Sequence, residues 1–309
     1  MQIFVAGATG VIGRRLVPLL LEAGHRVTGV ARTPGKRSAL ERAGADAVMV
    51  SLFEPGDLLQ ALAGHDTVIN VATHIPSTTR MLFPGAWREN DRVRREGAAN
   101  LASAAAAAGA ARFIQESFAP MYADGGDRWL DESAPVRPAR YNLSTLDAER
   151  AAHGFGERGG TAVVLRFATF YGPDAYHVPG MIKLVRKGWA AFPGSAGAFV
   201  SSVTHDDAAG AAAAALEVPG GTYNVVEDEP VSHREYFDVL ARTLGVPAPR
   251  LPPGWATPLF GPAGELLARS LRISNRKLRE ASGWAPRHPS VREGWPAVIR
   301  ELRAGAASR

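Results

Sequence analysis

The sequence predicts an α/β fold of the Rossmann type, a doubly wound parallel sheet with helices on both faces, followed by a smaller C-terminal region. Two observations predict it. Short apolar runs alternate with helical patterns along the first half of the chain, and a glycine-rich turn joins the first expected strand to the first expected helix. The expected strands span 3–6, 27–30, 47–50, 67–71, 112–115 and 162–167, and the expected helices span 13–23, 36–43, 58–62, 89–108 and 143–154.

The first of these elements is the strand at 3–6, a short apolar run that reads Ile-Phe-Val-Ala, and the glycines after it open the first helix. The apolar runs at 27–30, 47–50 and 67–71 repeat this pattern, with a helical stretch before each of the last two. Because strands that alternate with helices form βαβ units, these runs predict parallel strands. The longest expected helix, 89–108, is rich in alanine, a strong helix former, and is expected to pack on the sheet.

The pattern changes after Gly172, where Pro and Gly become frequent and aromatic residues collect. We therefore expect a Rossmann domain over 1–172 and a smaller covering region over 173–309. A strand at 222–226 is expected to return to the main sheet, and a helix at 232–244 is expected to stop at the glycine and proline that follow it.

Composition limits the possible functions. The chain has 309 residues, a net charge of +5 and no cysteine, which excludes disulfides, thiolate metal sites and cysteine nucleophiles. The basic residues are spread along the chain without a run of five, so a solvated surface is expected rather than nucleic-acid binding. No metal site is expected. No apolar stretch approaches the ~18 residues of a membrane span, and the N-terminus reads as a strand rather than a signal peptide, so we expect a cytoplasmic location without membrane attachment.

The glycine-rich turn has the spacing of a dinucleotide-binding motif. Gly7 permits a tight turn, Gly10 lets the backbone approach a pyrophosphate, and Gly13 lets the helix pack closely on the strand. The free N–H groups at the start of the helix then face the phosphates. The residues expected to bind cofactor here are Gly7, Ala8, Thr9, Gly10, Val11, Ile12 and Gly13. The alternative is a glycine turn without a ligand.

The end of the second strand indicates which dinucleotide is bound. An acid that binds the ribose hydroxyl is usual there, whereas this sequence has Arg32, with Lys36 and Arg37 nearby. The planar guanidinium suits a phosphate, so the sequence predicts NADP, with NAD still possible. The alternative is that Arg32 is simply an exposed side chain.

The chain resembles the extended, atypical short-chain dehydrogenase/reductase family, which contains NAD(P)-dependent nucleotide-sugar epimerases and dehydratases. The resemblance covers nearly the whole chain and implies that seven further residues contact the cofactor. The matching segments are G-A-T-G-V-I-G (7–13), D-T-V-I-N-V-A (66–72), E-G-A-A-N-L (96–101), R-F-I-Q-E-S-F-A-P-M-Y (112–122), Y-N-L-S-T (141–145), L-R-F-A-T-F-Y-G-P (165–173), V-T-H-D-D-A-A (203–209) and T-Y-N-V (222–225). The implied cofactor residues are Ser51, Leu52, Ala72, Thr73, Phe167, Ala168 and Thr169.

The resemblance also implies a catalytic set of Asn, Ser or Thr, Tyr and Lys, which this chain keeps at only one position. Tyr141 stands in the Tyr position, but Thr145 replaces Lys, Phe118 replaces Ser or Thr, and Arg94 replaces Asn. Without the lysine, Tyr141 lacks the charge that would lower its pKa from about 10. Ser117, next to the lost hydroxyl, and Arg94, with its fixed charge, are the candidates for compensation.

The substrate side favours a small hydrophobic molecule. Serines at 201 and 202 stand where nucleotide-sugar relatives carry a diphosphate-binding arginine, so nucleotide-sugars are not expected to bind. A largely apolar cleft with a few polar groups is typical of a site for a hydrophobic small molecule. The expected substrate residues are His74, Phe118, Tyr122, Phe170 and Trp189. The alternatives are that the aromatic residues only build a core between the two regions and that His74 is a loop histidine.

The sequence thus favours an NADP-binding enzyme of this family that acts on a small hydrophobic metabolite with a degenerate catalytic set. Two alternatives stay open: a non-redox epimerase, lyase or cyclase on the same scaffold, and a non-catalytic dinucleotide-sensing or regulatory protein. A homodimer also stays open.

Overall fold

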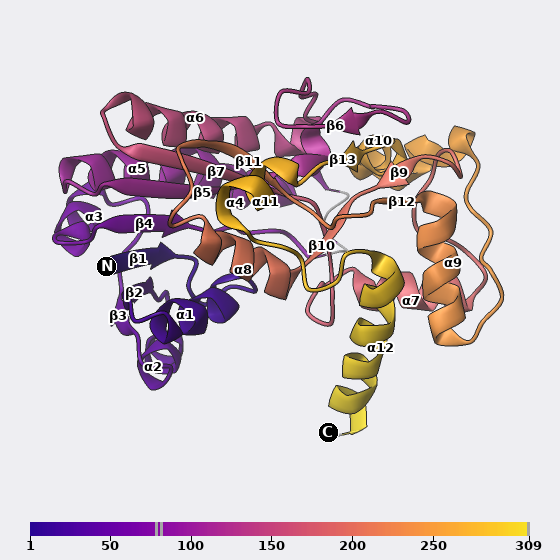
Figure 1. Cartoon of the computed structure of the whole chain (residues 1–309), viewed down its shortest axis with the longest axis horizontal. Coiled ribbons are helices and arrows are strands. Elements are labelled where there is room, and N and C mark those ends of the chain that lie inside the picture. Colours follow the sequence, from indigo (N-terminus) through magenta and orange to yellow (C-terminus); the bar gives the residue numbers. More distant parts are fainter. Residues whose placement is uncertain (78–79, 81–82, 308–309) are drawn as a thin grey trace.

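A computed structural model describes residues 1–77, 80 and 83–307 (Figure 1). Its centre is a seven-stranded sheet of the order β11-β7-β5-β4-β1-β2-β3, in which each neighbouring pair is parallel. This confirms the predicted Rossmann fold. The strands are β1 (Gln2–Ala6), β2 (Arg26–Val30), β3 (Asp46–Val48), β4 (Thr67–Asn70), β5 (Arg112–Phe118), β7 (Thr161–Phe167) and β11 (Gly221–Val225).

Helices cover both faces of this sheet. Figure 1 shows α1 (Gly13–Glu22), α2 (Pro34–Arg42) and α8 (His205–Ala214) on one face, and α3 (Pro55–Leu62), α5 (Ala98–Ala107) and α6 (Ser144–Glu157) on the other. Helix α1 buries Leu16, Val17 and Leu20 because these apolar residues lie three or four positions apart and therefore share one helix face. A separate apolar core lies on each side of the sheet.

The order in which strands are added to the sheet reverses at β1. The chain runs from β1 outward to β3 and then returns to β4 on the other side of β1. In open parallel sheets, ligands bind at the carboxyl ends of the strands at such a reversal. The glycine-rich turn follows β1 and therefore lies at this point.

The C-terminal region packs around a third apolar core, which contains Tyr236, Phe237 and Trp295. Its helices are α7 (Val178–Arg186), α9 (His233–Leu244), α10 (Gly264–Ala268), α11 (Arg276–Ser282) and α12 (Val291–Ala307). Three short strand pairs join segments that are distant in sequence: β8 (Thr169–Tyr171) with β10 (Ser202–Thr204), β9 (Phe199–Val200) with β12 (Val231–Ser232), and β6 (Trp129–Leu130) with β13 (Arg272–Ile273). Short 3₁₀ turns lie at Pro84–Trp87, Ala119–Met121, Arg140–Asn142 and Gly254–Ala263. The boundary expected at residue 172 stays a prediction.

The helix expected at 89–108 is interrupted. It consists of α4 (Arg88–Arg92), a π-helical turn over Val93–Gly97 and α5, in direct succession. A π turn inserts one residue into a helix and changes the direction of the side chains that follow, and such turns are frequent at functional sites. Here the turn carries Arg94, which is 5% exposed.

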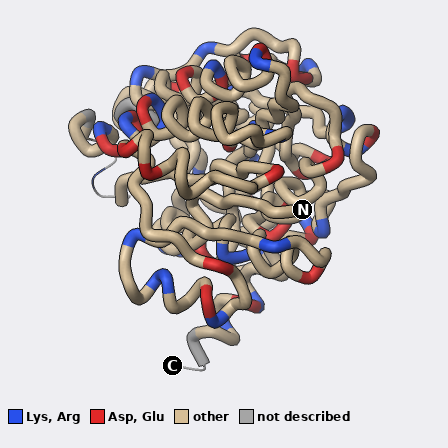
Figure 2. Tube along the Cα trace, turned by 90° about the vertical axis from the view of Figure 1, so that its left-hand side faces the viewer, with Lys and Arg blue, Asp and Glu red and all other residues tan. Residues whose placement is uncertain are grey.

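Charges of both signs are interspersed over the view in Figure 2, without a face of one sign. None of the helices in the described part of the chain is long and apolar enough to cross a membrane.

Candidate functional site

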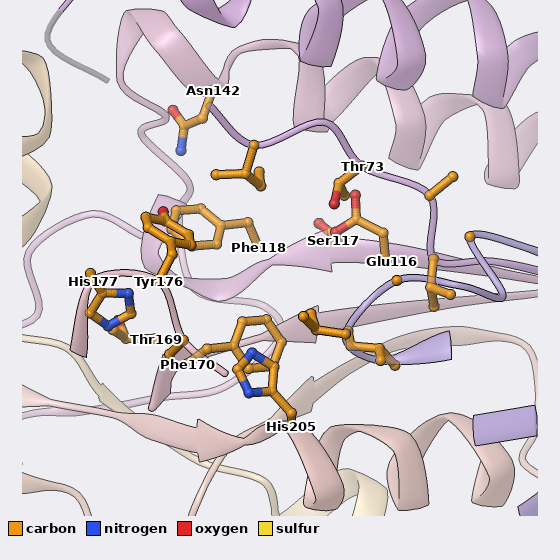
Figure 3. Close-up of a pocket in the computed structure, with 18 of the residues that line it drawn as sticks. Thr73, Glu116, Ser117, Phe118, Asn142, Thr169, Phe170, Tyr176, His177 and His205 are labelled. Carbon is orange, nitrogen blue, oxygen red and sulfur yellow. The ribbon is translucent and has the colours of Figure 1, made fainter. Parts of the chain in front are cut away.

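A cavity of about 1160 Å³ runs from the glycine-rich turn along the carboxyl ends of the strands to the start of α9. Residues from both halves of the chain line it, from Gly7 and Arg32 near one end, through Tyr141 and Phe170, to His233. The cavity is large enough for a dinucleotide and a small molecule together. Figure 3 shows its middle part, where Phe118, Tyr176 and the stacked pair of Phe170 and His205 surround the open space.

The glycine-rich turn forms the phosphate end of this cavity. Gly7 has a φ of +84°, and a Cβ there would lie 2.6 Å from the backbone carbon of Val71, so only glycine fits. The N–H of Gly10 donates to the carbonyl oxygen of Gly7 at 2.9 Å and closes the turn. Thr9, Gly10, Val11 and Ile12 line the cavity, whereas Ala8 and Gly13 build the turn without lining it.

The side chains expected around the adenosine half also reach the cavity. Arg32, Lys36, Ser51 and Leu52 line it, and Arg32 makes no ion pair with a described residue. Arg14, by contrast, pairs with Asp174. Burial raises the pKa of Asp174, but hydrogen bonds from Arg14 and Arg15 outweigh burial and lower it to about 2. Arg32 and Lys36 are therefore the cations of this part of the wall without an ion pair to a described residue, whereas Arg14 is neutralised by Asp174.

Three of the five residues expected along the middle of the dinucleotide line the cavity: Ala72, Thr73 and Thr169. Phe167 and Ala168 are 1% and 0% exposed and belong to the apolar core beneath it. They support the wall because they complete β7 and the link to β8.

Arg94 lies where the family's lysine is missing. Its Nη1 donates to the hydroxyl of Thr145 at 2.8 Å, and its Nε and Nη2 donate to the Glu116 carboxylate at 3.1 and 3.3 Å. Both charged residues line the cavity, and both are at least 94% buried. The guanidinium thus brings a positive charge to the position of Thr145 from a different helix, but Glu116 compensates that charge.

Ser117 belongs to a second buried network. Its hydroxyl donates to Glu149 at 2.5 Å, and the same carboxylate accepts two bonds from Arg166, each of 2.8 Å. Arg166 also donates to the hydroxyl of Tyr122, which donates to Asn224 at 2.8 Å. Ser117 lines the cavity, but its hydroxyl proton is committed to Glu149 and not free for a substrate oxygen.

Tyr141 lines the cavity and packs its ring on Trp87, with the centroids 4.5 Å apart. Burial raises the pKa of Tyr141 well above its ordinary value, and Tyr176 raises it further, while Arg94 and Arg269 oppose this only in part. Tyr141 therefore stays a protonated phenol at neutral pH, which can donate a proton but cannot serve as a base.

The expected substrate residues separate into two groups. Phe118 and Phe170 line the cavity. The other three lie outside the cavity. The hydroxyl of Tyr122 belongs to the buried network, and Trp189 faces solvent with 47% of its surface exposed. The backbone N–H of His74 donates to Asn90, and the His74 side chain is exposed.

Three histidines that line the cavity are not predicted by the sequence pattern. His205 stacks on Phe170 with the ring centroids 4.7 Å apart, and His177 and His233 lie further along the cavity. Burial lowers the pKa of His205, with Arg15 adding to the effect, to about 4. The motif V-T-H-D-D at 203–207 was the available signal for His205, whereas nothing in the sequence marks His233.

A family model described as NAD(P)H-binding matches residues 7–176, more than half of the chain. This chain is a member of that NAD(P)H-binding family. The match begins at the first glycine of the turn and includes the strands that carry Ser117 and Thr169 and the 3₁₀ turn that carries Tyr141.

Known proteins resemble this family member over most of its length. It is 35% identical over 310 residues to a 3-diazoavenalumate denitrifying reductase from a Streptomyces species, with 95% of this chain and 99% of that protein covered. It is 28% identical over 267 residues to a 2-alkyl-3-oxoalkanoate reductase from Shewanella oneidensis, with 79% of this chain and 66% of that protein covered. The crystal structure of the human epimerase family protein SDR39U1 with NADPH covers 98% of this chain and is itself covered completely, with a TM-score of 0.79 at 22% identity.

These similarities confirm the resemblance to the extended short-chain dehydrogenase/reductase family in fold, and they show an NAD(P)H-binding, reductase- or epimerase-like protein with a nicotinamide dinucleotide as cofactor. The geometry fits a dinucleotide, since the glycine-rich turn forms part of the cavity wall over 9–12 and Arg32 lines the cavity without an ion pair to a described residue.

Proposed function

We propose that this protein is an NADP(H)-dependent reductase of small aromatic compounds. We propose further that the reduction transfers a hydride to a carbon atom of the substrate and requires no proton from the protein. When bound, the reduced dinucleotide supplies a hydride. The observation that carries the proposal is the composition of the cavity wall in the middle of the cavity, between the glycine-rich turn and the start of α9. Phe118 takes the place of a hydroxyl donor, Tyr141 stays protonated, and Arg94 is paired with Glu116.

This wall is poorly suited to alcohol oxidation. A base is required to take the alcohol proton, and a phenol with a raised pKa cannot act as one at pH 7. A missing oxyanion donor costs about 3 kcal/mol of transition-state stabilisation, and Phe118 supplies no donor. Reduction suits a protonated Tyr141 better. The phenol can donate a proton where the reduction needs one, and it is not required where the reduction needs none.

The similarity to the Streptomyces reductase supports a diazo compound as the substrate class. In such a reduction a two-electron hydride forms a new C–H bond at the carbon that carries the diazo group. The C–N bond breaks, and dinitrogen leaves with the bonding pair. In a quinone diazide the negative charge of the hydride then rests on the ring oxygen as a phenolate, so charge and electrons balance without a proton donor in this step. The apolar aromatic wall of Phe118, Phe170 and Phe192 then has two tasks, which are to hold a planar ring and to exclude water.

The second candidate is reduction of a ketone, which the similarity to the oxoalkanoate reductase favours. In that reaction Tyr141 would donate the proton to the developing alkoxide. NADP rather than NAD serves either reaction, because Arg32 is uncommitted at the adenosine end and no acid stands there.

The test is NADPH oxidation with two substrate classes, an ortho-quinone diazide and a panel of aryl and alkyl ketones. C4-deuterated NADPH should place deuterium on the ring carbon that lost dinitrogen. Deuterium in the alcohol carbon of a ketone panel member, without reaction of the diazide, would favour the second candidate. The absence of NADPH oxidation with every compound of both classes would contradict the proposed function.

A further inference from the structure

The far end of the cavity contains a buried histidine. His233 is 1% exposed, and its Nδ1 is fully buried without a partner in the described structure. His233 also lines the cavity, so a ligand there can meet its ring. Buried polar atoms are nearly always paired, and an unpaired one costs about 1–3 kcal/mol, so His233 is a position at which a ligand would supply a missing partner.

The surroundings of His233 are apolar. Its ring meets Phe192 edge to face, with the centroids 5.5 Å apart, and β12 brings it beside Phe199 of β9. Phe199, Leu267 and Leu271 line the same part of the cavity. Burial lowers the pKa of His233 to about 4, so the imidazole is neutral at pH 7.

The start of α9 does not itself provide free donors. The N–H of His233 donates to Ala198, that of Arg234 to Ala196 and that of Glu235 to the Ser232 hydroxyl. The helix therefore fixes the position of the imidazole, and the ring is the group left to bind.

We propose that His233 anchors a hydroxyl group of the substrate at the end of the cavity opposite the glycine-rich turn. A neutral imidazole has one donor and one acceptor nitrogen, and a hydroxyl can pair with either. A carboxylate could pair only with the N–H, and Arg269, which lines the cavity near Leu267 and Leu271, is already paired with Glu265. The substrate class is thus an elongated apolar molecule with a hydroxyl remote from the carbon that is reduced.

This inference rests on the proposed function, because it assigns the far half of the cavity to the substrate. The test uses binding alone, so that its outcome is independent of turnover. Phenol and toluene, which have the same shape and differ in a hydroxyl for a methyl group, are titrated into the NADP⁺ complex at millimolar concentrations. We expect phenol to bind about tenfold more tightly than toluene to the natural protein.

Three variants complete the experiment. His233→Phe should bind both compounds equally, His233→Gln should keep part of the preference, and His153→Phe, at an exposed position of α6, should keep all of it. In ¹⁵N spectra of the natural protein, phenol but not toluene should shift the side-chain nitrogens of His233, which a purely structural role would not predict. Equal binding of the two compounds, a preference that persists in His233→Phe, or no saturation by phenol would overturn the proposal and leave ordered water as the partner of His233. Loss of NADPH oxidation alone would bear on the proposed function and not on this one.

Discussion

We expect the selectivity for NADPH over NADH to depend mainly on Arg32. Arg32 lines the cavity without an ion pair to a described residue, whereas Arg37, five residues further on, is paired with Glu41 at 2.8 Å. We expect Arg32→Ala to lower the preference for NADPH over NADH by about tenfold, or 1.4 kcal/mol, because it removes a charge-assisted bond to the 2′-phosphate. Titration calorimetry with both dinucleotides measures this, and Arg37→Ala is the matched control. An unchanged preference in Arg32→Ala would show that the phosphate is held elsewhere.

Tyr141 separates the two candidate reactions. Loss of a general acid costs about 10²–10⁴ in rate, but only where a proton must be transferred in the rate-limiting step. Because dinitrogen loss needs no such transfer, Tyr141→Phe should leave quinone-diazide reduction within a few fold and should lower any ketone reduction by at least about 100-fold. Stopped-flow absorbance of NADPH gives both rates on one preparation. An equal loss for the two substrates would mean that the hydroxyl positions the substrate instead.

At the scale of elements, the π-helical turn and β5 are joined by the ion pair of Arg94 and Glu116. Removal of one member of a buried pair leaves an uncompensated charge and costs about 3–5 kcal/mol. We expect Arg94→Met to lose this much stability in urea unfolding and the double variant Arg94→Met with Glu116→Gln to recover most of it. Arg95→Met, whose partner Asp147 lies at the surface, should change stability by less than about 1 kcal/mol. A double variant as unstable as Arg94→Met would show that packing dominates over charge.

The sequence could predict the elements that have a strong local signal. The glycine-rich turn and the strands after it were predicted because apolar runs and turn residues are local patterns. The same reasoning expected one helix over 89–108, because alanine-rich sequence favours a helix of any register and the π turn at Val93–Gly97 has no local signature. Arg94 could be named as a candidate, but its contact with Glu116 depends on that turn and on β5, which local patterns do not bring together.

The substrate half was less predictable for the same physical reason. Phe118 is the last residue of β5, and Phe170 lies three residues after β7, so their place at the carboxyl edge of the main sheet follows from the strand order. Tyr122 and Trp189 were expected in the cavity because they are aromatic, yet their positions are decided by partners more than 60 residues away, Asn224 and Arg250 respectively. Such long-range pairings have no counterpart in a local sequence pattern.

At the scale of the whole molecule, buried neutral histidines make stability depend on pH. His205 and His233 have pKa values lowered to about 4 in the folded protein, by burial first in both, whereas the unfolded chain binds their protons near 6.5. Above that value neither state is protonated and the effect is absent. As the pH falls from 6.5 towards 4, the unfolded state binds more protons and the free energy of unfolding decreases, by about 2 kcal/mol per histidine at pH 5.

Urea unfolding at pH 7.5 and pH 5 measures this difference. We expect His233→Phe and His205→Phe each to reduce the loss between the two pH values by roughly 2 kcal/mol relative to the natural protein. The exposed variant His153→Phe controls for titration of surface groups. An equal pH dependence in all four proteins would show that these imidazoles are protonated in the folded state.

The last strand of the sheet also determines how the chain is assembled during synthesis. Strand β11 pairs with β7 only after residue 221 of 309 has been made, and α8, which covers α1, lies just before it. More than two thirds of the 309 residues must therefore leave the ribosome before α8 and β11 can cover the apolar face of the sheet on which α1 packs. At roughly 5–20 residues per second, the first strand waits for about 10–40 seconds with that face open. Chaperones that bind apolar segments have their longest opportunity during this interval, and a break near residue 172 would separate β7 from the strand that completes its edge.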